Sequence, residues 1–323
     1  MGQDHHHGHD NSHHDHDHGG HGHAHGPGGH SHAPKDFGRA FAIGVGLNFA
    51  FVLVEVGAGL WSGSLALLAD AGHNLSDVLG LLLAWGATVL ARSAPTSRRT
   101  YGLRKVTILA SLANAVLLLV AVGVIASEAV RRFADPAEVA TGPVMIVAAI
   151  GVAINTATAL MFMKGHDDLN VRGAFLHMAA DAGVSLAVVV GAALIAVTGL
   201  LWIDPALSLL IAAVIVLGTW GLLRDSVDLA LDAAPKGVDV EAVRTWLSGR
   251  PGVTEVHDLH IWAMSTTETA LTAHVMRPVN DDGDGFLHET CEALAKKFGI
   301  GHATLQVEVG CAEPCRLAPA HAV

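Results

Sequence analysis

Between residues 37 and 224 the chain alternates long apolar runs with short polar breaks. Each run has about 20 residues or more, the length that an α-helix needs to cross the hydrocarbon core of a bilayer. The runs are residues 41–60, 65–90, 106–129, 143–163, 174–200 and 205–223. Gly, Ser, Pro, Asn and Asp gather in the breaks, where turns are expected. The pattern predicts an α-helical membrane domain of six transmembrane helices over residues 37–224.

From residue 225 onward the pattern changes to short amphipathic elements. Alternation of apolar and polar residues predicts strands, whereas a period near 3.6 predicts helices. Helices are predicted over 238–248 and 286–298, and strands over 253–264, 269–276 and 304–309. The order α-β-β-α-β predicts a small, metallochaperone-like α+β domain over residues 225–315, in which two helices cover a three-stranded sheet. Residues 316–323 form a short tail.

Histidine is concentrated before the first apolar run. Of 22 histidines, 13 precede Ala33, and this stretch also holds Gly and Asp but no apolar run. Such a segment cannot bury a core, so residues 1–36 are expected to be a disordered tail without a secretory signal. Imidazole binds zinc, copper and nickel, so the tail could collect metal. A solvated tail without this role is the alternative.

Composition and charge narrow the class of protein. The chain is 51% hydrophobic and 15% charged, whereas soluble domains carry roughly 25% charged residues. The net charge of −11 argues against a nucleic-acid partner. Basic residues gather in the break between the second and third runs, and such residues mark the cytoplasmic side. The sequence therefore predicts a multi-pass protein of the cell's inner (plasma) membrane, surrounded by the lipid bilayer, with both termini cytoplasmic.

Two apolar runs carry matched pairs of ionisable residues. His73 and Asp77 are four residues apart in the second run, and His177 and Asp181 have the same spacing in the fifth. Residues at i and i+4 share one face of a helix. A charged group at membrane depth costs about 2.5–3.5 kcal/mol and usually has a function. Facing each other, the pairs offer two nitrogens and two oxygens, which suits a tetrahedral Zn²⁺.

Other polar residues lie close to these pairs in the sequence. Asp70 precedes His73 by three residues and is expected to support the ligands or to line the path of the ion. Asn48 and Glu55, in the first run, have two open interpretations. They either hydrogen-bond to neighbouring helices or lie along the path of the ion.

Four segments resemble the cation diffusion facilitator family, in the order in which that family has them. They are WSGSLALLADAGHNLSD (61–77), NVRGAFLHMAADAGVS (170–185), VHDLHIWAM (256–264) and HATLQVE (302–308). The resemblance spans about residues 37–315. The last two segments resemble the cytoplasmic domain of the zinc-exporting branch of the family. It implies a homodimeric zinc/proton antiporter whose transport site is His73, Asp77, His177 and Asp181. Members with His at the first of these positions tend to favour zinc over cadmium.

The α+β domain offers a second set of candidate metal ligands. They are His257, His274, His302, Glu308, Cys311 and Cys315. His257 and His274 fall on neighbouring strands and could meet, whereas His257 and His260 should face opposite sides of a regular strand. The Cys-x3-Cys spacing lies within the range of zinc ligands. The resemblance implies zinc at the dimer interface, bound by His257, His274 and the tail after Glu308. Surface residues without metal are the alternative.

These features predict a secondary transporter that exports Zn²⁺ from the cytoplasm in exchange for protons, by alternating access. Cd²⁺, Co²⁺ and Ni²⁺ are further possible substrates, and zinc is also the expected ligand of the α+β domain. Two alternatives are an intramembrane metal-dependent hydrolase and a metal sensor that transports nothing. The sequence contains neither an HExxH nor a GxSxG motif, which argues against an enzyme.

Overall fold

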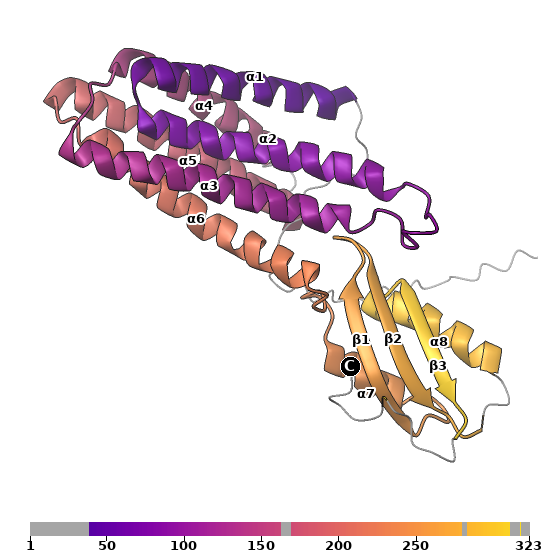
Figure 1. The fold of residues 1–323 in the computed structure, drawn as a ribbon. Helices are drawn as coiled ribbons and strands as arrows, with labels where there is room; N and C mark the ends of the chain where they lie inside the picture. The colour runs from indigo at the N-terminus through magenta and orange to yellow at the C-terminus, as the bar shows by residue number, and fades with distance from the viewer. Residues whose placement is uncertain (1–38, 163–168, 280–282, 311–316, 318–323) are drawn as a thin grey trace, which may run out of the picture.

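The computed structural model describes residues 39–162, 169–279, 283–310 and 317. Six long helices come first (Figure 1). Their bounds are α1 Arg39–Ser62, α2 Leu65–Ala91, α3 Val106–Ala134, α4 Thr141–Phe162, α5 Leu169–Thr198 and α6 Ile203–Ala230. Each is long and apolar enough to cross a bilayer, so the predicted six-helix membrane domain is confirmed. The helix α6 extends past its predicted end at residue 223 into a polar segment.

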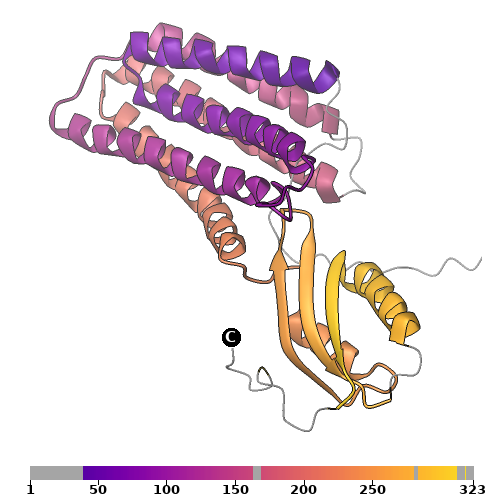
Figure 2. The same cartoon turned by 45° about the vertical axis from the view of Figure 1, so that its right-hand side comes forward.

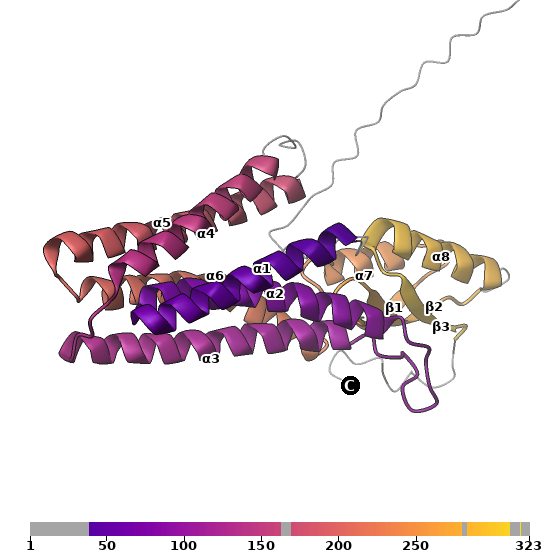
Figure 3. The ribbon, with the colours of Figure 1, turned by 90° about the horizontal axis from the view of Figure 1, so that it is seen from above.

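Small and β-branched residues allow the helices to pack closely. The buried core of the helical part draws residues from five helices, α2 to α6. Its members include Ala66, Leu67, Leu118, Val144, Val188 and Ile211. Alanines in this core, such as Ala66 and Ala148, let neighbouring backbones approach, and close van der Waals packing is one source of helix association in a membrane. Seen from above, α4 and α5 diverge from the other helices toward the end where the α+β domain lies (Figure 3).

At the end of the bundle far from the α+β domain, Asp204 connects α6 with α2 and α3. Its carboxylate accepts hydrogen bonds from the hydroxyl of Ser64 (2.5 Å) and from the backbone N–H groups of Leu65 (2.8 Å) and Ala66 (3.3 Å). Arg132 of α3 lies 3.9 Å from the same carboxylate, measured from Nη1 to Oδ2. The first N–H groups of a helix have no partner within the helix and favour a nearby anion. Asp204 therefore joins the start of α6 to the start of α2.

The second part of the chain has the predicted α-β-β-α-β order. Its elements are α7 Val240–Ser248, β1 Glu255–Ala263, β2 Thr269–Met276, α8 Gly283–Phe298 and β3 His302–Glu308. In the sheet, β1 pairs antiparallel with β2, and β2 pairs parallel with β3. Both helices lie against one face (Figure 2). Buried apolar residues from the helices and strands fill this layer, among them Val243, Leu247, Leu271 and Leu294.

A bulge in β1 changes which residues share a face. His257 pairs with His274 and His260 pairs with Thr272, so β1 has one residue more than β2 between these pairs. Because His274 and Thr272 are two apart on a strand, they point to the same face. His257 and His260 therefore lie on the same face, and the expectation of opposite faces, which assumed a regular strand, was wrong. This face is the one that the helices leave uncovered.

Charged contacts join the basic loop before α3 to the second part of the chain. Lys105 Nζ lies 2.5 Å from Asp232 Oδ1, and Arg104 Nη1 lies 2.7 Å from Glu268 Oε2. The backbone N–H of Thr266 also donates to the hydroxyl of Thr107 at 3.0 Å. The β1–β2 turn thus touches the start of α3.

Candidate metal centre

The two predicted pairs meet crosswise between α2 and α5. His73 Nε2 lies 3.0 Å from Asp181 Oδ1, and His177 Nε2 lies 3.3 Å from Asp77 Oδ2. His177 Nε2 is also 3.7 Å from Asp181 Oδ2. Each histidine therefore faces a carboxylate on the other helix. The i, i+4 spacing is what allows the contacts, because both members of a pair lie on the helix face that meets its neighbour.

The separations suit a small metal ion. Two ligand atoms bound tetrahedrally at about 2.0–2.2 Å from zinc lie about 3.3–3.6 Å apart. One nitrogen or oxygen from each of His73, Asp77 and Asp181 falls within 4.8 Å of the others. The site is buried on one side, since the Asp181 side chain is 4% exposed, whereas those of Asp77 and His177 are 35% and 38% exposed. Asp77 and His177 are therefore the two candidates on the accessible side of the group.

Two further carboxylates are fully buried beside the site. The Ser185 hydroxyl of α5 donates to Asp70 Oδ2 at 2.8 Å. The amide of Asn74 donates to Glu55 Oε2 at 2.9 Å. Asp70 therefore links α2 to α5 one turn from His73, and Glu55 links α1 to α2. In the sequence, Glu55 stands out because it lies in the middle of an apolar run, but nothing in the sequence identified Asn74 as its partner.

Asn48 lies apart from this group. Its side chain is exposed on α1, on the outer surface of the chain. The structure therefore does not bring Asn48 to the candidate metal ligands of α2 and α5.

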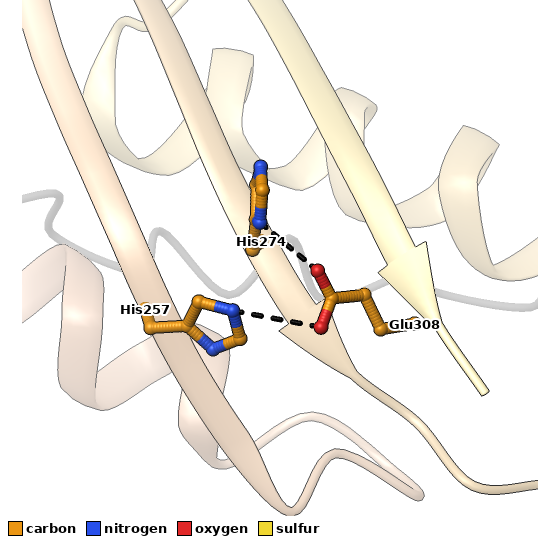
Figure 4. A group of neighbouring side chains, drawn as sticks. All are labelled: His257, His274 and Glu308. Atoms are coloured by element: carbon orange, nitrogen blue, oxygen red, sulfur yellow. Dashed lines mark ion pairs between the residues drawn. The ribbon is translucent and has the colours of Figure 1, made fainter. Parts of the chain in front are cut away.

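In the α+β domain, three side chains from three neighbouring strands converge (Figure 4). Glu308 Oε1 lies 3.0 Å from His274 Nδ1, and Glu308 Oε2 lies 3.5 Å from His257 Nε2. We call these residues the cytoplasmic triad. Both ring nitrogens of His257 and Oε2 of Glu308 are buried and have no hydrogen-bond partner among the described residues. Buried polar atoms nearly always have a bonding partner, and a metal ion bound here would supply one for these atoms.

Of the remaining candidates, His302 lies away from the triad. His302 begins β3 and Glu308 ends it. At about 3.3 Å per residue, roughly 20 Å separates them along the strand. The ring of His302 instead packs edge-on against Tyr101 in the loop before α3, with centroids 5.6 Å apart. Cys311 and Cys315 lie outside the described residues.

Comparison with known proteins agrees with both parts of the chain. Residues 41–229 match the cation efflux transmembrane domain, and residues 235–309 match the cytoplasmic domain of cation efflux proteins. The metal cation efflux system protein CzcD of Cupriavidus metallidurans is 36% identical over 285 residues, covering 87% of this chain and 89% of that protein. Zinc transporter ZitB of Escherichia coli is 38% identical over 273 residues, covering 84% and 86%.

A third relative is the cadmium, cobalt and zinc/H⁺-K⁺ antiporter of Bacillus subtilis. It is 33% identical over 266 residues, covering 80% of this chain and 85% of that protein. All three relatives are named for metal transport or efflux, and this excludes the hydrolase alternative. The protein is a multi-pass membrane protein that belongs to the cation efflux family, the cation diffusion facilitators.

Proposed function

We propose that this protein exports Zn²⁺ from the cytoplasm in exchange for protons, and that His73, Asp77, His177 and Asp181 hold the ion during transport. The observation that carries the proposal is the crossed pairing of these residues between α2 and α5. The names of its relatives support it, since one is a zinc transporter and another a cadmium, cobalt and zinc/H⁺-K⁺ antiporter. Cd²⁺, Co²⁺ and Ni²⁺ are candidate further substrates.

The same four groups can hold either protons or metal. An imidazole binds metal only in its neutral form, so metal binding releases protons from protonated histidines. Two imidazolium–carboxylate pairs have no net charge, and neither does Zn²⁺ with two carboxylates and two neutral imidazoles. Exchanging one zinc for two protons therefore leaves the charge of this buried site unchanged. Such an exchange avoids the large cost of an unbalanced charge in the membrane.

We place the protein in the inner (plasma) membrane with both termini cytoplasmic and with the domains divided at about residue 225. The five basic residues between α2 and α3 support this orientation. Alternating access would expose the site first to the cytoplasm and then to the outside. In this arrangement the His-rich residues 1–36, which lie outside the described part, would collect zinc on the cytoplasmic side. The protein would act as a homodimer.

Zinc flux into proteoliposomes tests the proposal. Purified protein is reconstituted with a zinc-sensitive dye inside the vesicles, and zinc is added outside. We expect uptake that is faster when the interior is acidic than when the two sides have equal pH, and internal alkalinisation that accompanies uptake. Vesicles without protein are the control. A protein that binds zinc but produces no flux would be a sensor, and flux without proton movement would rule out the exchange.

We further propose that zinc bound by the cytoplasmic triad tightens the dimer. From residue 225 onward the chain carries a net charge of −8, from 15 acidic and 7 basic residues. Two such copies repel each other, and divalent cations offset this repulsion. The full chain in detergent should sediment as a tighter dimer with zinc than with a chelator.

The His257→Ala, His274→Ala double variant tests whether the triad causes this response. The zinc-dependent shift should shrink by at least half in the double variant. His288→Ala, which removes a histidine outside the triad, is the control and should leave the shift unchanged. A shift of full size in the double variant would contradict a role for the triad in dimerisation.

A further inference from the structure

Behind the cytoplasmic triad, each histidine has a second carboxylate on the far side of its ring. Nδ1 of His274 faces Glu308, while its Nε2 lies 3.5 Å from Asp258 Oδ2. Nε2 of His257 faces Glu308, while its Nδ1 lies 3.5 Å from Glu255 Oε1. The two histidines therefore direct different ring nitrogens to the centre of the triad. Asp258 and Glu255 occupy the opposite, outer positions.

The β1 bulge is what brings Asp258 to this place. Asp258 adopts φ 49°, in the left-handed region that residues other than Gly, Asn and Asp rarely occupy. In a regular strand, Asp258 would point away from the face that holds His257. The bulge instead turns its carboxylate toward His274, which lies on the neighbouring strand. The bulge and the positive φ of Asp258 together allow its contact with His274.

A third histidine holds the Asp258 carboxylate. His260 Nε2 lies 2.9 Å from Asp258 Oδ1, so the two oxygens of Asp258 serve two different rings. The Asp258 side chain is 14% exposed, whereas that of Glu255 is 57% exposed. Water competes with contacts of an exposed carboxylate, and such pairs contribute little. Of the two outer carboxylates, Asp258 is therefore the one that can fix the ring it faces.

We propose that Asp258 is the positioning residue for His274 and that His260 holds Asp258 in place. Oδ2 of Asp258 lies 3.5 Å from Nε2 of His274. In the zinc-loaded site this carboxylate would favour the tautomer that carries its proton on Nε2 and offers the Nδ1 lone pair to the ion. A carboxylate behind a metal-binding imidazole fixes both tautomer and ring orientation, and it raises the basicity of the ligand. This inference rests on the proposed zinc site at the triad and adds the residues that prepare it.

Two substitutions separate this role from a purely structural one. Glycine adopts positive φ freely, so Asp258→Gly keeps the bulge and removes the carboxylate. Asparagine also tolerates this region, and its amide oxygen still accepts a hydrogen bond. Asp258→Asn therefore keeps the backbone and a weaker partner for His274. Glu241→Gln is the matched control, because Glu241 is an exposed carboxylate on α7, on the helix-covered side of the sheet.

The experiment uses the full chain in detergent with Asp181→Ala in the membrane site. Zinc affinity is measured by competition with a metal-binding dye, and binding that persists in the His257→Ala, His274→Ala variant is subtracted. We expect Asp258→Gly to weaken the remaining affinity about 10- to 100-fold. Asp258→Asn should have a smaller effect, and Glu241→Gln none. In chelator, melting temperatures should agree within about 2 °C, because the backbone is kept.

The tautomer of His274, observed by NMR, gives a second measurement. With ¹⁵N-labelled histidine, the zinc-loaded chain should show a protonated Nε2 for His274, identified by its loss in His274→Gln. In Asp258→Gly this signal should shift or broaden. Unchanged affinity and an unchanged His274 signal in Asp258→Gly would overturn the positioning role while leaving the zinc site intact. No zinc binding that depends on His257 and His274 would instead overturn the site itself, and with it the role of Asp258.

Discussion

Replacing Asp181 by alanine should reduce zinc transport to the level of vesicles without protein. Asp181 is the most buried of the four proposed ligands and lies within 3.7 Å of both histidines. Its loss leaves three ligands and removes one of the two negative charges that neutralise the ion. An uncompensated buried charge costs about 3–5 kcal/mol, which corresponds to roughly a 10²- to 10⁴-fold loss of affinity. Zinc flux and equilibrium zinc binding at the membrane site should both be lost.

Asp77→Ala should have the same effect on transport, because Asp77 supplies the other carboxylate and faces His177. Asp228→Ala is the matched control. It removes a half-exposed aspartate from the polar end of α6, where Oδ2 of Asp228 lies 4.0 Å from Nε of Arg224. This variant should leave zinc flux unchanged. Near-normal flux in Asp181→Ala or Asp77→Ala would contradict a four-ligand transport site.

Asp204→Ala should destabilise the whole helical bundle. Three hydrogen bonds from the start of α2 and the nearby Arg132 converge on this one buried carboxylate. Alanine would leave the N–H groups of Leu65 and Ala66 without this acceptor. It would also remove one of the two carboxylates near Arg132, which would keep its contact with Glu128. We expect a loss of about 3–5 kcal/mol and a fall of roughly 10 °C in the melting temperature in detergent.

Ser64→Ala provides the graded comparison for this prediction. It removes one donor to Asp204 and one side-chain cap of α2 but keeps the carboxylate and its contacts to Leu65 and Ala66. Its expected cost is about 1 kcal/mol, and zinc-binding affinity should be retained in both variants once they are folded. An Asp204→Ala protein that melts with the wild type would show that the three helices are held together elsewhere.

The sequence by itself determined the architecture. A bilayer requires every spanning segment to satisfy its own backbone, so each helix had to appear as an apolar run of sufficient length. The i, i+4 spacing of His73 with Asp77, and of His177 with Asp181, determined that each pair shares one helix face. The order and type of the later elements also followed from local periodicity, because the two faces of each helix and strand differ in polarity.

Only the tertiary structure decided which residues meet. The crossed pairing of the four proposed ligands depends on how α2 and α5 pack, and the link between Glu55 and Asn74 depends on how α1 meets α2. The register of parallel β3 against β2 brought Glu308 to His274 and left His302 at the far end of the strand. Periodicity cannot reveal these contacts, because it records the two faces of one element and not the register between elements.

The β1 bulge shows the same limit at the scale of one residue. A regular alternation places His257 and His260 on opposite faces, and a single additional residue at Asp258 reverses the assignment. Asp204 is a comparable case, since its sequence context suggested only a turn before a proline. Its partners lie about 140 residues earlier in the chain, next to Ser64. Local sequence specifies each element, whereas contacts over such separations form only when the packed elements bring distant residues together.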